Sequence, residues 1–386
     1  MFIPTRFALP RRRLLLATLL ASTGTGVVGA QALEALPGKP SLVRRALQFP
    51  RDLGSHPQTA IEWWYVTGAL RAAGRRLGFQ LTFFRSRVPS TQQMRSGFAA
   101  RQLIFAHAAV TDLQAGRLLH DQRIARSSGQ AEVDLASSST DDTDVRLRDW
   151  RLRRDGEHYM AQVQATDFGF ALKLQQSQPL LLQGDQGWSR KGPEAAQASS
   201  YYSVPQLLVS GELTLAGGAL PVEGRAWLDH EWSESMLHAD AVGWDWIGMN
   251  LDDGSALAAF RLRTRQGDTL WAGGSWRAAG EKMARAFAPE DLEFKPGRQW
   301  RSTLSGASYP VQWFIHVRMP GPDGFSAGTM WQKLQVRALL DNQELDSRHS
   351  TGAIYWEGLS DLLDDTGRTL GSGYLEMTGY ASPLRL

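Results

Sequence analysis

Short runs in which apolar and polar residues alternate dominate the chain after about residue 57. In one run Phe79, Leu81 and Phe83 alternate with Gln80 and Thr82, and similar runs cover residues 159–165, 168–174 and 256–263. A period of two is typical of strands that bury one face, and the Gly, Asp, Asn and Ser residues between the runs favour turns. No long helical pattern competes, because the best helix candidates, residues 233–241 and 286–294, are short. The pattern therefore predicts an all-β fold.

The chain divides into two halves of similar length. We predict a domain boundary at Gly217-Gly218, which separates an N-terminal domain of residues 57–217 from a C-terminal domain of residues 218–386. Both halves are rich in short alternating runs, and residues 62–68 and 373–380 form a faint internal repeat. A chain of this length exceeds the usual size of one hydrophobic core. We expect two related barrels or sandwiches, with a single large β-sandwich as the alternative.

The N-terminus has the pattern of an export signal, which we assign to residues 1–32. Arg11-Arg12-Arg13 precede an apolar stretch, and Ala30-Gln31-Ala32 supplies a small-x-small cleavage site, so we expect cleavage near Ala32. The paired arginines favour a twin-arginine signal, and general Sec export is the competing interpretation. The signal predicts a periplasmic or secreted protein. Residues 33–56 contain Pro and Arg without clear periodicity, and we interpret them as a leader arm.

Charge and cysteine content exclude several classes of protein. The signal holds four of the chain's 42 basic residues and none of its 39 acidic residues, so the mature chain is nearly neutral. A role in binding nucleic acid therefore has little electrostatic support. The absence of Cys excludes a disulfide framework, a thiolate metal site and a cysteine nucleophile.

The candidate chemistry gathers in one segment of the second half. Trp227-Leu228-Asp229-His230-Glu231-Trp232-Ser233 is followed closely by Gly243-Trp244-Asp245-Trp246. Indole rings around an ionisable group can shift its pKa and stabilise a nearby positive charge. On a strand, Asp229 and Glu231 share one face, while His230 and Trp232 share the other. The segment is equally compatible with a structural role, in which the acids pair with arginines and the indoles fill the core.

Other aromatic positions are candidates for ligand binding. Trp63 and Tyr65 lie in Glu62-Trp63-Trp64-Tyr65, and Tyr202 follows a polar loop that could line a binding mouth. Such residues more often close a barrel or cap it than take part in chemistry.

Generic motifs give little support to other chemistries. The G-x-G-x-x-G match at residues 24–29 lies inside the signal, and no G-x-S-x-G elbow occurs. His230, Glu234 and His238 have the spacing of a metal-binding helix face, but the H-E-x-x-H order is absent. We therefore expect no metal and no cofactor.

The same segments carry a family resemblance over residues 50–386. Residues 62–68, 226–233 and 243–246, together with residues 188–192, 355–358 and 373–380, resemble the AttH-like branch of the carotenoid 1,2-hydratase superfamily. The resemblance implies two lipocalin-like antiparallel β-barrel domains packed together. The hydratase branch adds water to a carbon–carbon double bond without a cofactor. The His230-x-Trp232 pair is similar to a pair in that branch, whereas an Arg often stands at the position of His230 in the AttH-like branch.

Three functional hypotheses follow from the resemblance and from the acidic residues that lie among the indole rings. The first is an exported protein that binds an apolar, lipid- or isoprenoid-like molecule and hydrates or hydrolyses it. In this hypothesis Asp229, Glu231 or Asp245 supplies the proton and His230 acts on water. Trp63, Tyr65, Tyr202, Trp232, Trp244 and Trp246 then line the site. The second is a non-catalytic periplasmic lipid carrier beside an inner-membrane permease of the ABC type, and a scaffold without a small ligand is the weaker third. We expect a monomer.

Overall fold

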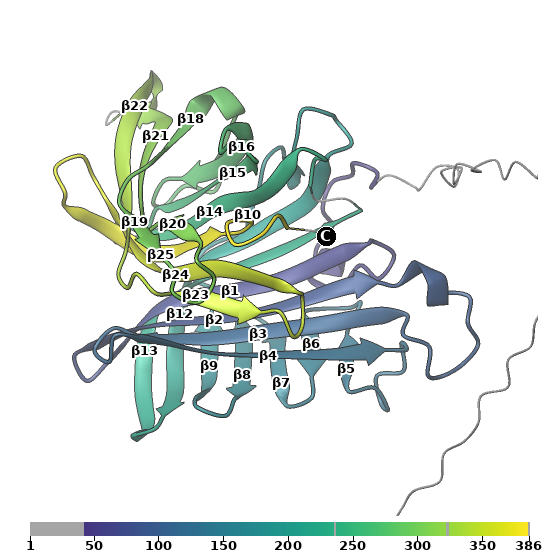
Figure 1. The fold of residues 1–386 in the computed structure, drawn as a ribbon. Coiled ribbons are helices and arrows are strands. Elements are labelled where there is room, and N and C mark those ends of the chain that lie inside the picture. The colour runs from purple at the N-terminus through teal and green to yellow at the C-terminus, as the bar shows by residue number, and fades with distance from the viewer. Residues whose placement is uncertain (1–41, 235–236, 322–323, 385–386) are drawn as a thin grey trace, which may run out of the picture. The chain divides into compact units, whose positions relative to one another are not determined.

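The computed structural model describes residues 42–234, 237–321 and 324–384 and consists almost entirely of strands (Figure 1). Its only helices in those ranges are the single 3-10 turns η1 (Arg51–Leu53), η2 (Pro89–Thr91) and η3 (Pro289–Asp291). Nothing helical in this part of the chain has both the length and the apolar character that a membrane-spanning segment needs. The all-β prediction is confirmed. The predicted signal, residues 1–32, lies outside the described residues.

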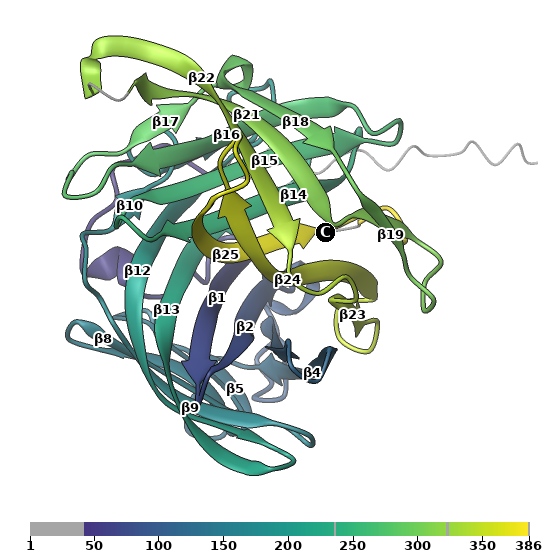
Figure 2. The ribbon, with the colours of Figure 1, turned by 90° about the vertical axis from the view of Figure 1, so that its left-hand side faces the viewer.

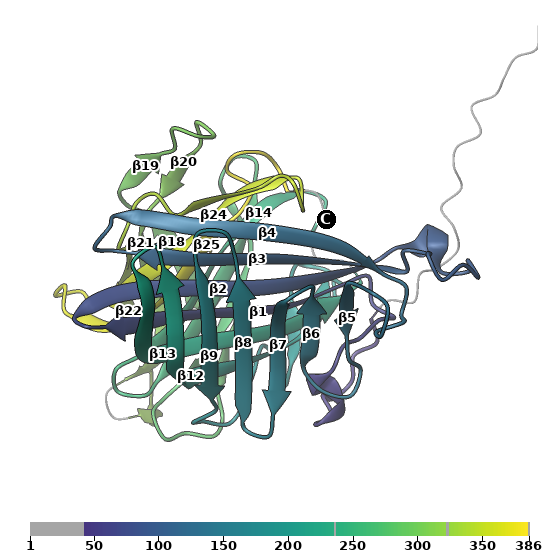
Figure 3. The same ribbon diagram turned by 90° about the horizontal axis from the view of Figure 1, so that it is seen from below.

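Thirteen strands form the first sheet, in which every pairing is antiparallel. They are β1 (Ile61–Ala72), β2 (Arg75–Arg87), β3 (Gln102–Asp112), β4 (Arg117–Ser127), β5 (Ala136–Ser138), β6 (Asp144–Leu147), β7 (Trp150–Asp155), β8 (His158–Gln164), β9 (Gly169–Gln175), β10 (Leu181–Leu182), β11 (Trp188–Arg190), β12 (Ala198–Leu215) and β13 (Gly218–Ser233). The main order is β4-β3-β2-β1-β13-β12-β9-β8-β7-β6-β5. Figure 3 shows β1–β4 lying across the row from β9 to β5. Because β4 also contacts β5, the two ends of the sheet meet and nearly close a barrel.

The alternating sequence explains the inside of this first barrel. Phe79, Leu81 and Phe83 of β2 point into one core, together with alternate residues of β8 and β9 such as Tyr159 and Phe170. Each of these side chains is at most a few per cent exposed. The strands predicted at residues 79–83, 159–165 and 168–174 correspond to β2, β8 and β9 and are confirmed. Their apolar side chains stand two positions apart, which places them on one face of a strand.

The second sheet takes the rest of the chain. Its strands are β14 (Ala241–Leu251), β15 (Ala256–Thr264), β16 (Thr269–Arg277), β17 (Arg285–Phe287), β18 (Leu292–Pro296), β21 (Gln312–Gly321), β22 (Gly324–Ala338), β23 (Glu344–Ser347), β24 (Ala353–Leu363) and β25 (Thr369–Met377). The main order is β17-β16-β15-β14-β25-β24-β22-β21-β18. In the chain η3 lies between the two edge strands, β17 and β18, and it contacts their neighbours β16 and β21. A separate ribbon pairs β19 (Gln299–Arg301) with β20 (Ser308–Pro310). This sheet has its own interior core, which includes Ile247, Trp313 and Trp356.

The predicted domain boundary falls inside the first sheet. Gly217-Gly218 lies at the turn between β12 and β13, which form a long hairpin from Leu215↔Gly218 onward. Strand β13 pairs with β12 on one side and with β1 on the other, so it belongs to the first sheet. The second sheet begins with β14 at Ala241. The described residues from 42 onward belong to one compact unit. The division into two domains stays a prediction.

One helix candidate is wrong. Residues 286–294 hold the end of β17, η3 and the start of β18, because Pro289 starts a single turn and the flanking residues pair with β16 and β21. The other candidate, residues 233–241, includes residues 235–236, which lie outside the described part of the chain.

The two sheets pack against each other through the outer faces of their barrels. Strand β1 contacts β25, β2 contacts β24 and β13 contacts β14 (Figure 2). A third apolar cluster joins the sheets, with Tyr65 and Trp227 from the first and Trp246, Phe260 and Tyr374 from the second. Gly78 permits this approach, because a Cβ there would stand 2.5 Å from the hydroxyl of Tyr374.

Candidate active site

A cavity of about 330 Å³ lies between the two sheets, outside both barrel cores. Its volume falls within the usual range for small-molecule sites. Four of the six predicted ligand-binding aromatics line it, namely Trp63, Tyr65, Trp244 and Trp246. The walls also include Phe84, Phe105, His107, Lys191, Tyr201, Asp229, Glu231, Phe260, Leu262, Tyr355, Glu357 and Glu376. An aromatic hollow thus contains five carboxyl groups, those of Glu62, Asp229, Glu231, Glu357 and Glu376.

The alternation of β13 distributes the predicted residues over two compartments. Asp229 and Glu231 face the cavity, whereas His230 and Trp232 point into the first barrel. Strand β1 follows the same rule beside it, because Trp63 pairs with Glu231 and Tyr65 pairs with Asp229. The cavity therefore collects two acids of the predicted cluster and excludes its imidazole.

Asp229 is held by three donors and buried on all sides. Its carboxyl group accepts hydrogen bonds from the Tyr201 hydroxyl at 2.7 Å and the Trp227 indole at 2.6 Å, and from the Ser203 hydroxyl. Burial raises the pKa of Asp229 to about 7, although these donors oppose the shift. An aspartic acid in this state can still hold a proton near neutral pH, which is the requirement for a general acid.

Glu231 has a different partner and therefore a different character. The Lys191 ammonium group lies 2.9 Å from its carboxylate, and the Ser199 hydroxyl also donates to it. Lys191 is itself held over the rings of Tyr201 and Phe260, at 4.8 and 4.2 Å from their centroids. Glu231 is therefore one half of a buried ion pair, unlike Asp229.

The second sheet contributes two carboxyl groups that the sequence did not single out. Glu357 of β24 and Glu376 of β25 are directly opposite each other in the ladder. Burial and then the charge of Glu376 raise the pKa of Glu357 well above its ordinary value. Burial raises the pKa of Glu376 to about 7, with contributions from Asp229 and Glu231 and opposition from a hydrogen bond of Trp244. Like charges this close cannot both ionise cheaply, so the pair retains a proton.

A neutral histidine joins the sheets at the cavity wall. His107 Nε2 lies 2.8 Å from the Ser350 hydroxyl, which itself donates to Gln122, so Nε2 carries the proton and donates to Ser350. Nδ1 then accepts from the Tyr355 hydroxyl, also at 2.8 Å. Burial lowers the pKa of His107 to about 3, so the imidazole stays uncharged.

Asp245 does not line the cavity. It points from β14 into the second barrel, where the Arg261 guanidinium lies 2.8 Å away and the Tyr380 hydroxyl donates at 2.9 Å. Trp244 and Trp246, its neighbours in sequence, face the opposite way into the cavity, because side chains alternate along a strand.

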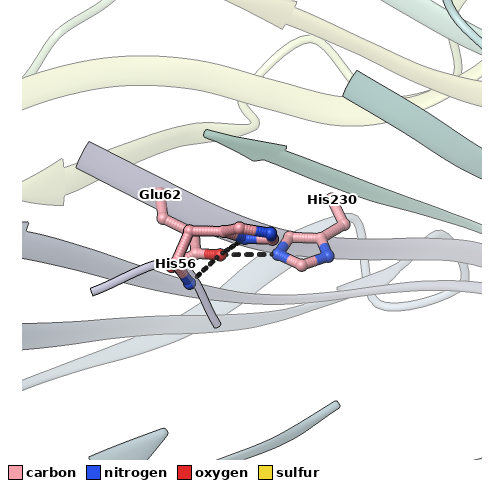
Figure 4. A group of neighbouring side chains, drawn as sticks. All are labelled: His56, Glu62 and His230. Atoms are coloured by element: carbon pink, nitrogen blue, oxygen red, sulfur yellow. Dashed lines mark hydrogen bonds and ion pairs between the residues drawn. The ribbon is translucent and has the colours of Figure 1, made fainter. Parts of the chain in front are cut away.

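His230 belongs to a polar network inside the first barrel (Figure 4). Its Nε2 donates to Glu62 Oε1 at 2.8 Å, and the Tyr202 hydroxyl lies 3.0 Å from its Nδ1. His56 also donates to Glu62 Oε1 at 2.8 Å and stacks on Trp232, with ring centroids 3.7 Å apart. Burial lowers the pKa of His230, so it remains a neutral donor. Tyr202 and Trp232 thus line this network and not the cavity.

The network is the only group of three potential ligands within 4.8 Å of one another among the described residues. Two imidazoles and a carboxylate are a common zinc set. Glu62, however, already accepts from both rings, from Ser55 at 2.9 Å and from Arg85 at 2.8 Å. Burial opposes its ionisation, but these donors and the Arg85 charge lower the pKa of Glu62 well below its ordinary value. The buried guanidinium supplies the cation, so we assign no metal here.

The spacing-based metal set is not assembled. Glu234 lies 3.6 Å from Arg87, and His238 lies 3.6 Å from Asp240, while His230 pairs with Glu62. His230 lies on β13, whereas Glu234 and His238 follow the end of that strand, so no helix brings the three side chains to one face.

The AttH-like family model matches residues 40–380. A crystal structure described as an AttH protein of Nitrosomonas europaea is 45% identical, covers 89% of this chain and 99% of its own, and has a TM-score of 0.78. Kievitone hydratase of Nectria haematococca is 13% identical, covers 87% of this chain and 94% of its own, and has a TM-score of 0.65, which is a likeness of fold alone. The search of curated proteins found no match. The predicted two-barrel, lipocalin-like fold class is confirmed.

Proposed function

The chain belongs to the AttH-like family, and from that premise we propose that it binds an apolar, isoprenoid- or lipid-like molecule between its two sheets and catalyses its cofactor-free hydration or hydrolysis. The aromatic walls suit an apolar ligand, and the buried acids suit proton transfer. The fold is shared with a protein named as a hydratase, which agrees with this proposal.

One observation carries the proposal: Asp229 is buried against indole and phenol rings with its pKa raised to about 7. Such a carboxylic acid is protonated in a substantial fraction at neutral pH and faces a hollow large enough for a substrate. A purely structural acid would instead be expected to pair with a base, as Asp245 does with Arg261.

The hydration follows from these positions. The Asp229 carboxylic acid gives its proton to one carbon of a double bond, so a C–H bond forms as the π bond breaks. The cation left on the neighbouring carbon is stabilised by the faces of Trp63 and Trp244, which are partly exposed in the cavity. A water oxygen then bonds to that carbon, and the ionised form of Glu376 takes the proton that the water releases. Proton exchange restores both acids.

Geometry favours Asp229 over the other predicted acids. Glu231 is committed to its ion pair with Lys191, and Asp245 lies in the second barrel. His230 cannot act on cavity water from the far side of β13. We therefore assign proton donation to Asp229, and Glu376 replaces His230 as the base.

The test is turnover by an Asp229→Asn variant. The purified protein is incubated with a panel of unsaturated isoprenoids and isoprenoid esters, and mass spectrometry follows the gain of one water molecule. We expect wild-type turnover of at least one compound and a loss of about a hundredfold or more in Asp229→Asn, with ligand binding retained, because general acid catalysis supplies about 10²–10⁴-fold.

Asp245→Asn is the matched control, since it neutralises a buried aspartate of β14 outside the cavity. Its turnover, corrected for the folded fraction from an unfolding curve, should equal that of the wild type. Unchanged turnover in Asp229→Asn would remove Asp229 from the mechanism. Binding of panel compounds without any wild-type turnover would instead support the carrier hypothesis.

Location and partners rest on the sequence. The paired arginines and the Ala30-Gln31-Ala32 motif support export of this activity from the cytoplasm. Interaction with an inner-membrane permease and a monomeric state stay predictions.

A further inference from the structure

Two neighbouring loops at one end of the first barrel expose large apolar side chains. The first loop joins β2 to β3 at residues 88–101, and the second joins β4 to β5 at residues 128–135. A Cβ added at Gly97 of the first loop would lie 3.6 Å from Nε2 of Gln130 in the second, so the loops are side by side. Their exposed apolar side chains, which we call the loop-tip patch, are those of Met94, Phe98, Val133 and Leu135.

The exposure of the loop-tip patch is unusual for this protein. Phe98 is 80% exposed and Val133 is 72% exposed, and no large apolar side chain among the described residues is more exposed than Phe98. The Phe98 ring packs only loosely, with the Arg126 guanidinium group 5.3 Å from its centroid. Apolar side chains that gather in water mark surfaces that bind a partner.

The surroundings of the loop-tip patch carry positive charge. Its arginines are Arg95, Arg101, Arg126 and Arg146. The last three donate to main-chain carbonyl groups of the two loops at 3.0–3.3 Å, which orders the loops without neutralising the guanidinium groups. The first loop contains no acid, and the second contains Glu132 and the buried Asp134. A positive excess therefore remains around the apolar side chains.

We propose that the loop-tip patch docks on the surface of a membrane that contains anionic phospholipid. Phe98 and Val133 enter the boundary between headgroups and acyl chains, while the arginines lie among the lipid phosphates. Apolar side chains next to arginines have the composition of an interfacial membrane anchor, and an anionic surface attracts each arginine.

The shape and the charge of the loop-tip patch favour a membrane over a protein partner. The loop between β2 and β3 extends beyond the ends of its strands (Figure 3). Such tips enter a fluid bilayer without a complementary groove. A second copy of the chain, related by a twofold axis, would bring the same positive charge against this one, and like charges disfavour such an interface.

The loop-tip patch also adjoins one end of the cavity. Ile61 at the start of β1 and Ser86 near the end of β2 both line the cavity, and the first loop begins at Val88. Docking therefore brings this end of the cavity towards lipid, which suits an apolar ligand. The docking itself does not depend on the proposed catalysis.

A fluorescent label on the loop tests the proposal. The chain has no cysteine, so an introduced cysteine takes an environment-sensitive fluorophore at one position. Ser96→Cys carries the label on the exposed first loop, and Thr366→Cys is the matched control on the exposed turn between β24 and β25. We expect vesicles that contain phosphatidylglycerol to raise and blue-shift the emission of the label at residue 96 and to leave the label at residue 366 unchanged.

Vesicles of phosphatidylcholine alone should bind at least about tenfold more weakly, because each arginine near an anionic surface contributes about fivefold. For the same reason Arg95→Gln, measured with the label at residue 96, should weaken binding to the phosphatidylglycerol vesicles about fivefold. Phe98→Ser should weaken it about tenfold, because the apolar ring no longer leaves water. Trp331→Ser is the matched control and should keep wild-type binding, since Trp331 is another exposed aromatic side chain beside an arginine, Arg318, on β22.

Four outcomes overturn the proposal. An unchanged label at residue 96, or equal binding to the two kinds of vesicle, excludes docking on anionic lipid. Equal changes at residues 96 and 366, or a loss in Trp331→Ser as large as in Phe98→Ser, excludes docking through the loop-tip patch. Sedimentation without vesicles covers the other occupant, because a dimer that Phe98→Ser converts to a monomer would assign the patch to a second copy of the chain. None of these results bears on turnover by Asp229, so the proposed function is tested separately.

Discussion

Replacing Asp229 by Asn should change how the stability of the protein depends on pH. In the folded state burial keeps the Asp229 proton up to a pKa of about 7, whereas an unfolded aspartate releases it near 3.8. Because folded Asp229 binds more protons than unfolded Asp229 between these two values, its contribution to stability is greatest at low pH and is lost as the pH rises to about 7. Asn carries no such charge. Its amide oxygen can accept from Trp227, while its NH₂ group can face the Tyr201 hydroxyl.

The size of the effect follows from the width of the window. Each pH unit corresponds to about 1.4 kcal/mol, so from about pH 5 to the pKa near 7 the wild type loses about 2.7 kcal/mol that Asp229→Asn retains. Glu376 adds to the same difference, because the charge of Asp229 contributes to raising its pKa. Contributions of groups far from Asp229 cancel when the two proteins are compared.

Urea unfolding followed by tryptophan fluorescence, at about pH 5 and about pH 8, measures this difference. The free energy of unfolding of Asp229→Asn relative to the wild type should increase by about 2–3 kcal/mol between the two conditions. Asp245→Asn should lose about 3–5 kcal/mol at both pH values, because it strips a buried arginine of its partner. If the difference in free energy of unfolding between the wild type and Asp229→Asn is the same at both pH values, the claim that Asp229 is a buried acid that holds a proton is refuted.

Two further predictions concern the polar groups around the site. Glu62→Gln should lower the free energy of unfolding by about 3–5 kcal/mol, because the buried Arg85 loses its counter-charge. Glu293→Gln removes a surface pair and should change it by less than about 1 kcal/mol, and equal urea midpoints for the two variants would contradict this reasoning. His107 should make a contribution of the opposite sign, which lowers stability as the pH falls from 6.5 towards about 4, because folded His107 with its pKa near 3 stays neutral while the unfolded imidazole charges. His107→Gln should show about 3 kcal/mol less of this loss in the same urea assay, and parallel curves for both proteins would exclude His107 as its source.

The alternation of residues predicted a large part of the fold and some of the site. Phe79 and Phe83 identified a strand and its buried face, because the period of two is a local property of the chain. The same period assigned Asp229 and Glu231 to one side of β13 and His230 to the other, which is how the structure has them. A joint catalytic role for all three conflicted with that geometry from the outset.

The remaining site residues depend on long-range pairing that no local pattern contains. Glu357 and Glu376 meet only because β24 pairs with β25, and they face Asp229 only because the two sheets pack together. Alternation could have identified both as members of one face, since each stands one position from a buried core residue, Trp356 or Leu375. Lys191 follows the short strand β11, and nothing in the sequence indicates its partner Glu231.

The two-sided character of β13 has a consequence for how such proteins can diverge. At the odd-numbered positions Asp229 and Glu231 line the cavity and Trp227 lies in the cluster between the sheets, whereas Leu228 and Trp232 belong to the core of the first barrel. Point substitutions can therefore retune the accepted molecule over many generations while the barrel persists. An insertion or deletion of one residue within this segment has the opposite result, since it exchanges the two sets at once and puts acids in the core. Lineages of this fold should consequently tolerate varied chemistry at the odd positions but a nearly fixed length of the segment.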